Sequence, residues 1–544
     1  MTPVASKPLT PRLTAIAAGM LVCTAVTAET RVLTYHNDIS RTGQNISETV
    51  LTPANVSSDR FGKLFSHPVD GDVYAQPLYV PKLAIPGKGI HDVVFVATEG
   101  DSVYAFDADN IKGSNADALW HVSLIDADHG AGPKATPVDA ATDLACSAIA
   151  PQVGITASPA IDSSREIIYV EAFSKENGAL IHRLHALYIT NGAEVHGSPV
   201  VITGRVQRKE QNDTVFDPSR QLGRAGLLLS NHIVYVAYGS HCDKPRFHGW
   251  MFAYDATTLV QKGTFVTAPD HGKAAIWMSG AGPAADSKGN VFVATGDGWF
   301  DTQAIPAVDL GDSILEIALH ADNLALVDYF TPFNQVSLAR HDGDLGSGGV
   351  LLLPDQAGKH PHVLIEVGKM GTLYVVDRGT MTIADRHYCN ACTADRQIVQ
   401  ELPGAVSGGV WGMPAYWKDT VYVSGSQDVL RAFSLKGGRL VPMPASISPD
   451  ICEYPGCGLS VSAHGEEDGI LWALQVGAYD SKAPAVLKAY DARDLGRILY
   501  TSNQHGERDV SGGAVRFSVP TVVDGKVYVG GAGQLTAFGL LDRP

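Results

Sequence analysis

The sequence has no excess of basic residues: 41 Lys and Arg stand against 57 Asp and Glu, which gives a formal net charge of −16. This balance argues against a protein that binds nucleic acid or an anionic membrane through its overall charge. The apolar stretch over residues 13–22 is too short for a transmembrane helix, so we expect no membrane span. The hydrophobic content of 45% excludes a disordered chain. A chain of 544 residues is nevertheless too long for one ordinary core unless its fold grows by repetition.

The first 28 residues resemble an export signal. Lys7 and Arg12 form a cationic start, the apolar run 13–22 follows, and the segment 26–28 offers the small residues that signal peptidase needs. We therefore expect cleavage after residue 28 and a periplasmic or secreted protein. Lipidation at Cys23 is an alternative, although the residue before it is bulkier than a lipoprotein signal requires.

Cysteines are few, and cleavage would leave an even number of them. The six are Cys146, Cys242, Cys389, Cys392, Cys452 and Cys457. In an exported protein an even count favours disulfides over thiolate metal sites. Cys389 and Cys392 are followed by Thr393 and not by His, so the pair is no c-type haem attachment site and we expect no haem. We interpret it as a local structural loop, with a redox-active dithiol as the alternative.

The chain also lacks long stretches of helical periodicity and instead alternates short β-rich runs with Gly, Asp and Asn. The segment VVFVATEGDSVYAFDADN, from Val93, reads as a strand, a tight turn and a second strand, and seven other segments repeat this pattern. Equivalent positions in the second strands are Ala105, Ala186, Ala253, Glu316, Val375, Ala432, Ala489 and Ala537, at intervals of 48 to 81 residues. Such repeats predict an all-β fold, an eight-bladed β-propeller of four-stranded blades.

Each hairpin follows a run that begins with small residues, which fits the crowded innermost strand of a blade. The last hairpin lacks an outer strand, whereas residues 62–69 form a strand without a blade. We therefore predict that 62–69 closes the ring by pairing with the last blade. The resulting division is a signal peptide over 1–28, an N-terminal extension over 29–61 and the propeller over 62–544. Two β-sandwich domains are the alternative, which the regular eightfold motif disfavours.

The four strands of such a blade are numbered outward from the axis. The connection from strand four of one blade to strand one of the next blade lies on the same face of the propeller as the connection from strand two to strand three. The unusual residues in these connections are Trp277, Asp342, Asp344, Trp411, Arg508, Asp243, Asp297 and Lys369. Cys146 and Cys242 fall on this face in neighbouring blades and could pair, and Cys452 could pair locally with Cys457. This face is where a propeller usually binds its ligand.

Carboxylates on this face could hold a hard cation, and tryptophan rings could sandwich a planar ligand. The alternative is structural. Asp and Gly are ordinary turn formers, so the TGDG at Thr295 and the HDGD at His341 also fit simple turns. Trp277 and Trp411 could equally be core aromatics.

Several motifs resemble those of the quinoprotein alcohol dehydrogenases, which are eight-bladed propellers that bind pyrroloquinoline quinone (PQQ) and a cation on the axis. These motifs are TYHNDISRTGQN…LTPANVSSDRFGKLF, IWMSG…NVFVATGDGW…GDSILEIAL, RHDGDLG…HVLIEVGKMGTLYVVDRGT and GGVWGMPAYW. The resemblance covers essentially the whole chain after the signal, although only these blades carry specific motifs.

The resemblance implies a role for each residue that matches the family's pattern. Trp277 would stack on the quinone, with Trp411 as a second aromatic beside the cofactor. Lys369 would stand beside the reactive carbonyl and Asp342 would be the general base. Three further carboxylates would hold Ca²⁺ or a lanthanide, namely those of Asp297, Asp344 and Asp243.

The sequence also departs from the family's pattern. Asp297 replaces the family's metal-binding Asn, and Asp243, out of register, is the sole substitute for its metal-binding Glu. The adjacent Cys-Cys pair is absent, and the tryptophans that brace each blade are largely missing, with Trp120 one of the few that remain.

Two functions follow from these observations. In the first, the protein is an exported PQQ-dependent oxidoreductase that oxidises an alcohol or sugar hydroxyl, and a separate electron acceptor takes the electrons because no haem motif is present. In the second, it is a non-catalytic propeller that binds a protein or glycan on the same rim. A different enzyme chemistry in the channel is a third alternative, since fold does not determine function.

Overall fold

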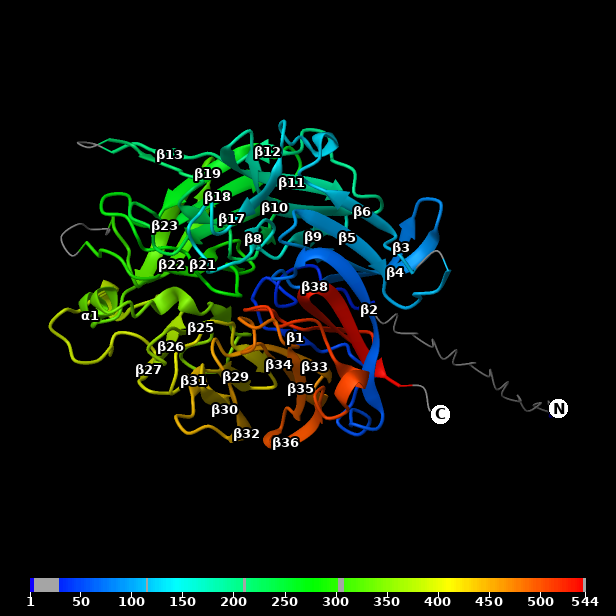
Figure 1. Cartoon of the computed structure of the whole chain (residues 1–544). Helices are drawn as coiled ribbons and strands as arrows, with labels where there is room; N and C mark the ends of the chain where they lie inside the picture. Colours follow the sequence, from blue (N-terminus) through cyan, green and yellow to red (C-terminus); the bar gives the residue numbers. More distant parts are fainter. Residues whose placement is uncertain (4–28, 114–115, 209–211, 302–307, 542–544) are drawn as a thin grey trace.

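The structure, a computed structural model, describes residues 1–3, 29–113, 116–208, 212–301 and 308–541. Within these residues eight blades follow one another around a central axis in chain order, as the colours of Figure 1 show. The predicted all-β, eight-bladed propeller is therefore confirmed. Apart from residues 1–3, the predicted signal peptide lies outside the described residues.

The first four blades are antiparallel sheets whose strands run outward from the axis in chain order. Blade 1 contains β3 (Leu78–Ile85), β4 (Gly89–Ala97), β5 (Ser102–Asp107) and β6 (Trp120–Ser123). Blade 2 contains β9 (Ala160–Asp162), β10 (Ile167–Glu176), β11 (Ala179–Tyr188) and β12 (Val200–Val201). Blade 3 contains β16 (Leu228–Ser230), β17 (Ile233–Ser240), β18 (Trp250–Asp255) and β19 (Gln261–Val266). Blade 4 contains β20 (Ala284–Ala285), β21 (Val291–Ala294), β22 (Ile314–His320) and β23 (Asn323–Phe330).

The remaining blades continue the ring. Blade 5 contains β24 (Leu351–Leu352), β25 (Val363–Val367), β26 (Leu373–Asp377) and β27 (Gln400–Leu402). Blade 6 contains β28 (Ala415–Trp417), β29 (Thr420–Ser424), β30 (Asp428–Lys436) and β32 (Ser446–Cys452). Blade 7 contains β33 (Cys457–His464), β34 (Glu467–Gln475), β35 (Val486–Asp491) and β36 (Asp494–Thr501). Blade 8 contains β37 (Thr521–Val523), β38 (Lys526–Leu540) and β2 (Phe61–Asp72).

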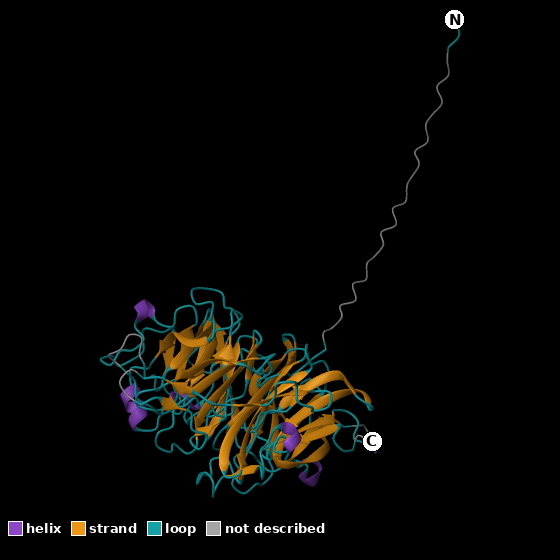
Figure 2. Ribbon diagram, turned by 90° about the horizontal axis from the view of Figure 1, so that it is seen from above, coloured by secondary structure: helices purple, strands orange, loops and turns teal. Residues whose placement is uncertain are grey.

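Short additional elements decorate the blades. The extra strands are β1 (Gln44–Asn45), β7 (Thr136–Asp139), β8 (Gln152–Val153), β13 (Arg205–Val206), β14 (Thr214–Val215), β15 (Gln221–Leu222) and β31 (Arg439–Leu440). The helical pieces are η2 (Ala127–His129), α1 (Gln335–Arg340), η3 (Leu345–Ser347), η4 (Ile383–Asp385) and η5 (Gly506–Asp509). Figure 2 shows them as short purple pieces among the loops. No described helix is long and apolar enough to cross a membrane.

The ring closes where the two ends of the propeller meet. The first residues of β38 pair with β37, and its last residues pair with β2 in antiparallel register from Phe61 opposite Leu540 to Pro68 opposite Gln534. Figure 1 shows the blue strand β2 beside the red strand β38. The predicted closing strand is therefore confirmed. Closure gives blade 8 its outer strand and covers the edge that β38 would otherwise expose.

Each blade is buried on both faces because it stacks between two neighbours. The strands β21, with the sequence VFVA, and β25, with VLIEV, are buried at every position. Continuous β-branched and aliphatic runs suit a strand in this position. The core is therefore a ring of apolar layers between blades, and the loops at the two ends carry the polar residues.

Residues 32–48, here called the arm, cross the channel at the centre of the ring. The arm forms hydrogen bonds with the inner strand, or residues beside it, in all eight blades; its partners are Tyr79, Ile161, Leu227, Ala285, Leu352, Tyr416, Val461 and Val522. Most of these bonds join backbone groups, so the arm ties the blades together. The predicted N-terminal extension is thus, over this part, an internal element of the propeller.

Arg41 is the polar centre of the arm. It is fully buried, and its guanidinium donates to the carbonyl oxygens of Pro283 (2.8 Å), Leu227 (3.1 Å) and Tyr35 (2.7 Å) and to the Thr34 hydroxyl (2.7 Å). These acceptors come from the arm and from blades 3 and 4. A buried guanidinium with its donors satisfied in this way fixes the arm in one position.

Candidate functional site

Three carboxylates converge at one mouth of the channel. Oxygens of Asp297, Asp342 and Asp344 all lie within 4.8 Å of one another. Asp297 lies between β21 and β22, whereas Asp342 and Asp344 lie between α1 and η3. The structure thus brings these three residues together on one face, here called the site rim. The site rim is the face of the propeller that carries two kinds of loop. One kind joins strands two and three within a blade, and the other joins the fourth strand of a blade to the first strand of the next blade.

Two lysines pair with these carboxylates. The Lys369 ammonium lies 2.7 Å from Asp342 Oδ1 and 2.7 Å from Asp344 Oδ2, and Lys273 pairs with Asp297. Asp344 Oδ1 also accepts the Asp297 backbone N–H at 2.5 Å. Burial lowers the pKa of Lys369, but the charges of Asp344 and Asp342 outweigh it, and the net shift is upward. The three negative charges therefore already face two positive ones.

Asp243 lies nearby but outside this group. It follows β17, and its Oδ1 accepts the Ser240 hydroxyl at 2.8 Å. Burial raises its pKa, and the charges of Asp344 and Asp342 raise it further. Asp243 is thus close enough to sense the cluster electrostatically, but it does not share the three-carboxylate group.

Trp277 lies directly against the acidic cluster. A Cβ at Gly296 would come within 2.6 Å of Asp344 Oδ1 and 3.0 Å of Trp277 Cδ1, and a Cβ at Gly239 would come within 3.3 Å of Trp277 Cε3. Glycine at these positions therefore lets the indole and the carboxylates approach each other. Trp277 is only 9% exposed, so protein atoms cover almost all of its surface.

Arg224 lies against both Trp277 and Phe517 near the axis. The Arg224 guanidinium carbon lies 5.2 Å from the Trp277 ring centre and 4.0 Å from the Phe517 ring centre. Phe517 has a φ of +66°, which is rare for a bulky residue. The signal that could have found Arg224 is a charged residue at the start of an otherwise small and apolar inner strand.

Trp411 lies on the site rim in a row of aromatic residues. Its ring centre is 5.1 Å from that of Tyr454, which is 6.1 Å from that of Tyr479, and the Arg516 guanidinium carbon lies 4.4 Å from the Tyr479 ring centre. Arg508, also expected on this rim, pairs instead with Asp509 beside β2. The aromatic row extends the site from blade 5 toward blade 8.

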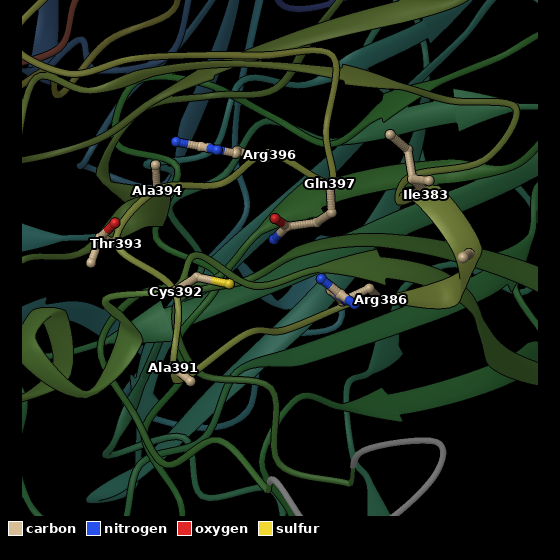
Figure 3. A pocket seen from close by; sticks show the side chains of 9 residues that line it. Ile383, Arg386, Ala391, Cys392, Thr393, Ala394, Arg396 and Gln397 are labelled. Atoms are coloured by element: carbon tan, nitrogen blue, oxygen red, sulfur yellow. The ribbon is translucent and has the colours of Figure 1, made fainter.

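All six cysteines after residue 28 form disulfides. The pairs are Cys146–Cys242, Cys389–Cys392 and Cys452–Cys457. The first joins loops of neighbouring blades on the site rim, as expected, and the third lies beside the aromatic row. The second borders a pocket of about 520 Å³ that the loop between β26 and β27 lines by itself (Figure 3). This pocket contains none of the predicted site residues.

The residues at the axis do not fit a quinone stacked on Trp277. A stacked ring system needs an open face of the indole, and Trp277 is 9% exposed with Arg224 against it. Two cavities at this level, on either side of Phe517, have volumes of about 10 Å³ each. Such a cavity holds about one water molecule, far less than three fused rings.

The acidic cluster suits a bound cation better than the surroundings of Trp277 suit a quinone. Carboxylate oxygens are suitable ligands for Ca²⁺ or a lanthanide, and Asp297, Asp342 and Asp344 are close enough to share one ion. Lys369 and Lys273 already supply positive charge there, so a cation would have to displace their ammonium groups.

No family model matches the chain, and no curated protein sequence matches it. The fold is similar to that of the quinohemoprotein alcohol dehydrogenase from Comamonas testosteroni, with a TM-score of 0.61 and 15% sequence identity over 95% of this chain and 82% of that chain. It is also similar to the quinohemoprotein alcohol dehydrogenase ADHIIG from Pseudomonas putida HK5, with a TM-score of 0.57, 15% identity and the same coverage. The expected likeness in fold to quinoprotein alcohol dehydrogenases is confirmed.

Proposed function

We propose that the protein is a quinoprotein-like propeller that binds a protein or glycan partner on its site rim and works without a bound quinone. The observation that carries this proposal is the position of Arg224, whose guanidinium lies against Trp277 where the family resemblance would place the quinone. The pairing of the acidic cluster with Lys369 and Lys273 supports it, since these carboxylates are not free for a cation.

The site rim offers surface for such a partner. Trp299 and Met370, in loops of blades 4 and 5, are both 58% exposed, and Tyr454 is 36% exposed. Aromatic residues and methionine are enriched in the cores of interfaces. Three disulfides support a periplasmic or secreted location, because such bonds persist in oxidising compartments.

A second candidate is the PQQ-dependent oxidation of an alcohol or sugar hydroxyl, with a separate electron acceptor. The convergence of Asp297, Asp342 and Asp344 beside Trp277 supports it, as does the pairing of Lys369, the residue to which the resemblance gives the family's basic role, with two of these carboxylates. It would require Arg224 to leave the indole, which would open a face for the quinone.

Reconstitution separates the two functions. The purified protein is incubated with PQQ and either Ca²⁺ or La³⁺, and dye reduction is followed over a panel of alcohols and sugars. We expect no reduction above the rate with free PQQ. Turnover that depends on both PQQ and an alcohol, and that Asp342→Asn abolishes, would overturn the scaffold proposal.

A binding assay tests the scaffold function itself. The protein is applied to a glycan array, and Trp299→Ser is compared with Val201→Ser, a similarly exposed apolar residue on the outer strand β12 of blade 2. Binding that Trp299→Ser removes and Val201→Ser preserves supports a glycan partner. Glycan binding that both variants retain would contradict the proposed surface.

A further inference from the structure

Arg224 is a buried arginine that forms no ion pair with any residue that the structure describes. It is 8% exposed, and within the described part of the chain its guanidinium forms no ion pair and its buried Nε has no hydrogen-bond acceptor. Arg41, equally buried in the same channel, has acceptors for all of its guanidinium nitrogens. The difference between the two arginines therefore needs an explanation.

The cavity beside Arg224 is lined mainly by residues that carry hydroxyl groups and aromatic rings. Its guanidinium borders a cavity of about 10 Å³ that is also lined by Tyr35, Tyr74, Thr156, Ser158 and Phe517. The Ser158 hydroxyl accepts the Gln76 N–H at 2.8 Å and keeps its own proton available. Tyr74 brings a further hydroxyl to the cavity wall, whereas the Thr156 hydroxyl donates to Glu99 Oε2 at 3.1 Å.

A buried guanidinium is unfavourable unless something compensates its charge. The rings of Phe517 and Trp277 compensate part of it through their π faces. A second cation, Arg516, increases the local positive charge: burial and then Arg516 lower the pKa of Arg224, to about 9, so the guanidinium stays protonated at neutral pH. The remaining requirement is for a negative charge.

We propose that the cavity beside Arg224 binds one small monovalent anion, held by the guanidinium and by the hydroxyls of Tyr74 and Ser158. The cavity volume limits the ligand to about the size of one water molecule, which favours a single-atom anion such as chloride and excludes polyatomic anions. The bound anion would neutralise Arg224 and hold it against Trp277 and Phe517. This site is independent of any partner on the rim.

Bromide is a suitable probe because it quenches indole fluorescence on contact and Trp277 lies beside Arg224. The wild-type protein is titrated with sodium bromide against sodium gluconate at constant ionic strength, and tryptophan emission is recorded. We expect a saturable component of quenching on top of the linear collisional one. Chloride is expected to compete with bromide, and competition by formate as strong as that by chloride would contradict the size limit of the cavity.

Two variants assign the site. Arg224→Met is expected to lose the saturable component and to keep the linear one. Arg497→Met, which removes an exposed guanidinium from the outer strand β36, is expected to keep both. Purely linear quenching of the wild type would overturn the proposal, and so would saturable quenching that persists in Arg224→Met.

A third variant covers the case in which Arg224→Met does not fold. Tyr74→Phe removes a single hydroxyl from the cavity wall and should raise the bromide dissociation constant about tenfold, as expected for one lost hydrogen bond to a charged group. An unchanged dissociation constant in this variant would contradict the assigned cavity. Neither outcome depends on whether the rim binds a partner.

Discussion

The guanidinium carbon of Arg224 lies 4.0 Å from the centre of the Phe517 ring. Phe517 reaches this position with a φ of +66°, and Gly280, with a φ of +56°, lies directly behind it. A Cβ at Gly280 would come within 2.6 Å of the Phe517 Cβ. The closed axis therefore depends on a strained phenylalanine and on a glycine that leaves room for it.

Replacing Gly280 tests this packing. Gly280→Ala adds both left-handed strain and an overlap with Phe517, and we expect it to lower the free energy of unfolding by about 2–4 kcal/mol. Gly506→Ala is the matched control, because Gly506 has a φ of +55° and no atom within 4 Å of the added Cβ. The control should lose about 1–2 kcal/mol, measured by urea unfolding. Equal losses in the two variants would contradict the packing argument.

The two buried arginines should respond oppositely to replacement by methionine. Arg41→Met leaves four buried acceptors without their donor, and we expect it to lower the free energy of unfolding by about 3–5 kcal/mol. Arg224→Met removes an unpaired buried charge, so in halide-free buffer it should leave stability unchanged or increase it. Urea unfolding of both variants checks the contrast. A large loss in Arg224→Met would show that the guanidinium has a partner within the protein.

Glu366 predicts a pH dependence of stability. Its side chain is fully buried on β25, neither carboxyl oxygen has a hydrogen-bond partner among the described residues, and burial raises its pKa to about 8. The folded protein then binds this proton more tightly than the unfolded chain, so the stabilisation is complete below about pH 4.5 and is lost as the pH rises to about 8.

Glu366→Gln should remove this component, on the order of 4 kcal/mol between pH 5 and pH 9. The measurement is urea unfolding at several pH values. The exposed Glu466→Gln serves as the control and should keep the wild-type slope. A slope in Glu366→Gln equal to that of the wild type would contradict the assignment.

Lys369 should determine how well the acidic cluster binds a cation. In the wild type its ammonium pairs with both Asp342 and Asp344, and Tb³⁺ would have to displace it. We expect Lys369→Gln to bind Tb³⁺ at least tenfold more tightly, as detected by terbium emission sensitised through Trp277. Lys418→Gln, on the turn between β28 and β29, should not change the affinity. Tight Tb³⁺ binding by the wild type, unchanged in Lys369→Gln, would contradict this role.

The architecture could be predicted because each blade repeats a local pattern. Seven of the eight marker positions lie in the third strand of their blades, and Ala537 lies in the last part of β38, which pairs with β2. The convergence of Asp297, Asp342 and Asp344 on one face followed from the same topology, since alternate connections of a propeller share a rim. These features depend on order along the chain, which the sequence shows directly.

The contents of the channel could not be predicted in this way. Arg41 binds carbonyls 186 and 242 residues away along the chain, and no local pattern encodes such contacts. Arg224 precedes the inner strand of blade 3 and Phe517 precedes the inner strand of blade 8, so the two residues meet only once the ring is complete. The resemblance identified Trp277 but not what covers it, because that depends on packing at the axis.

Direct binding of PQQ tests the central claim most simply. The wild-type protein is titrated with PQQ in the presence of Ca²⁺ and, separately, La³⁺, with tryptophan emission and equilibrium dialysis as readouts. With Arg224 held against Trp277, we expect no stoichiometric binding with either cation. One tightly bound quinone per chain, with quenching of Trp277 that Trp277→Phe removes, would contradict the account.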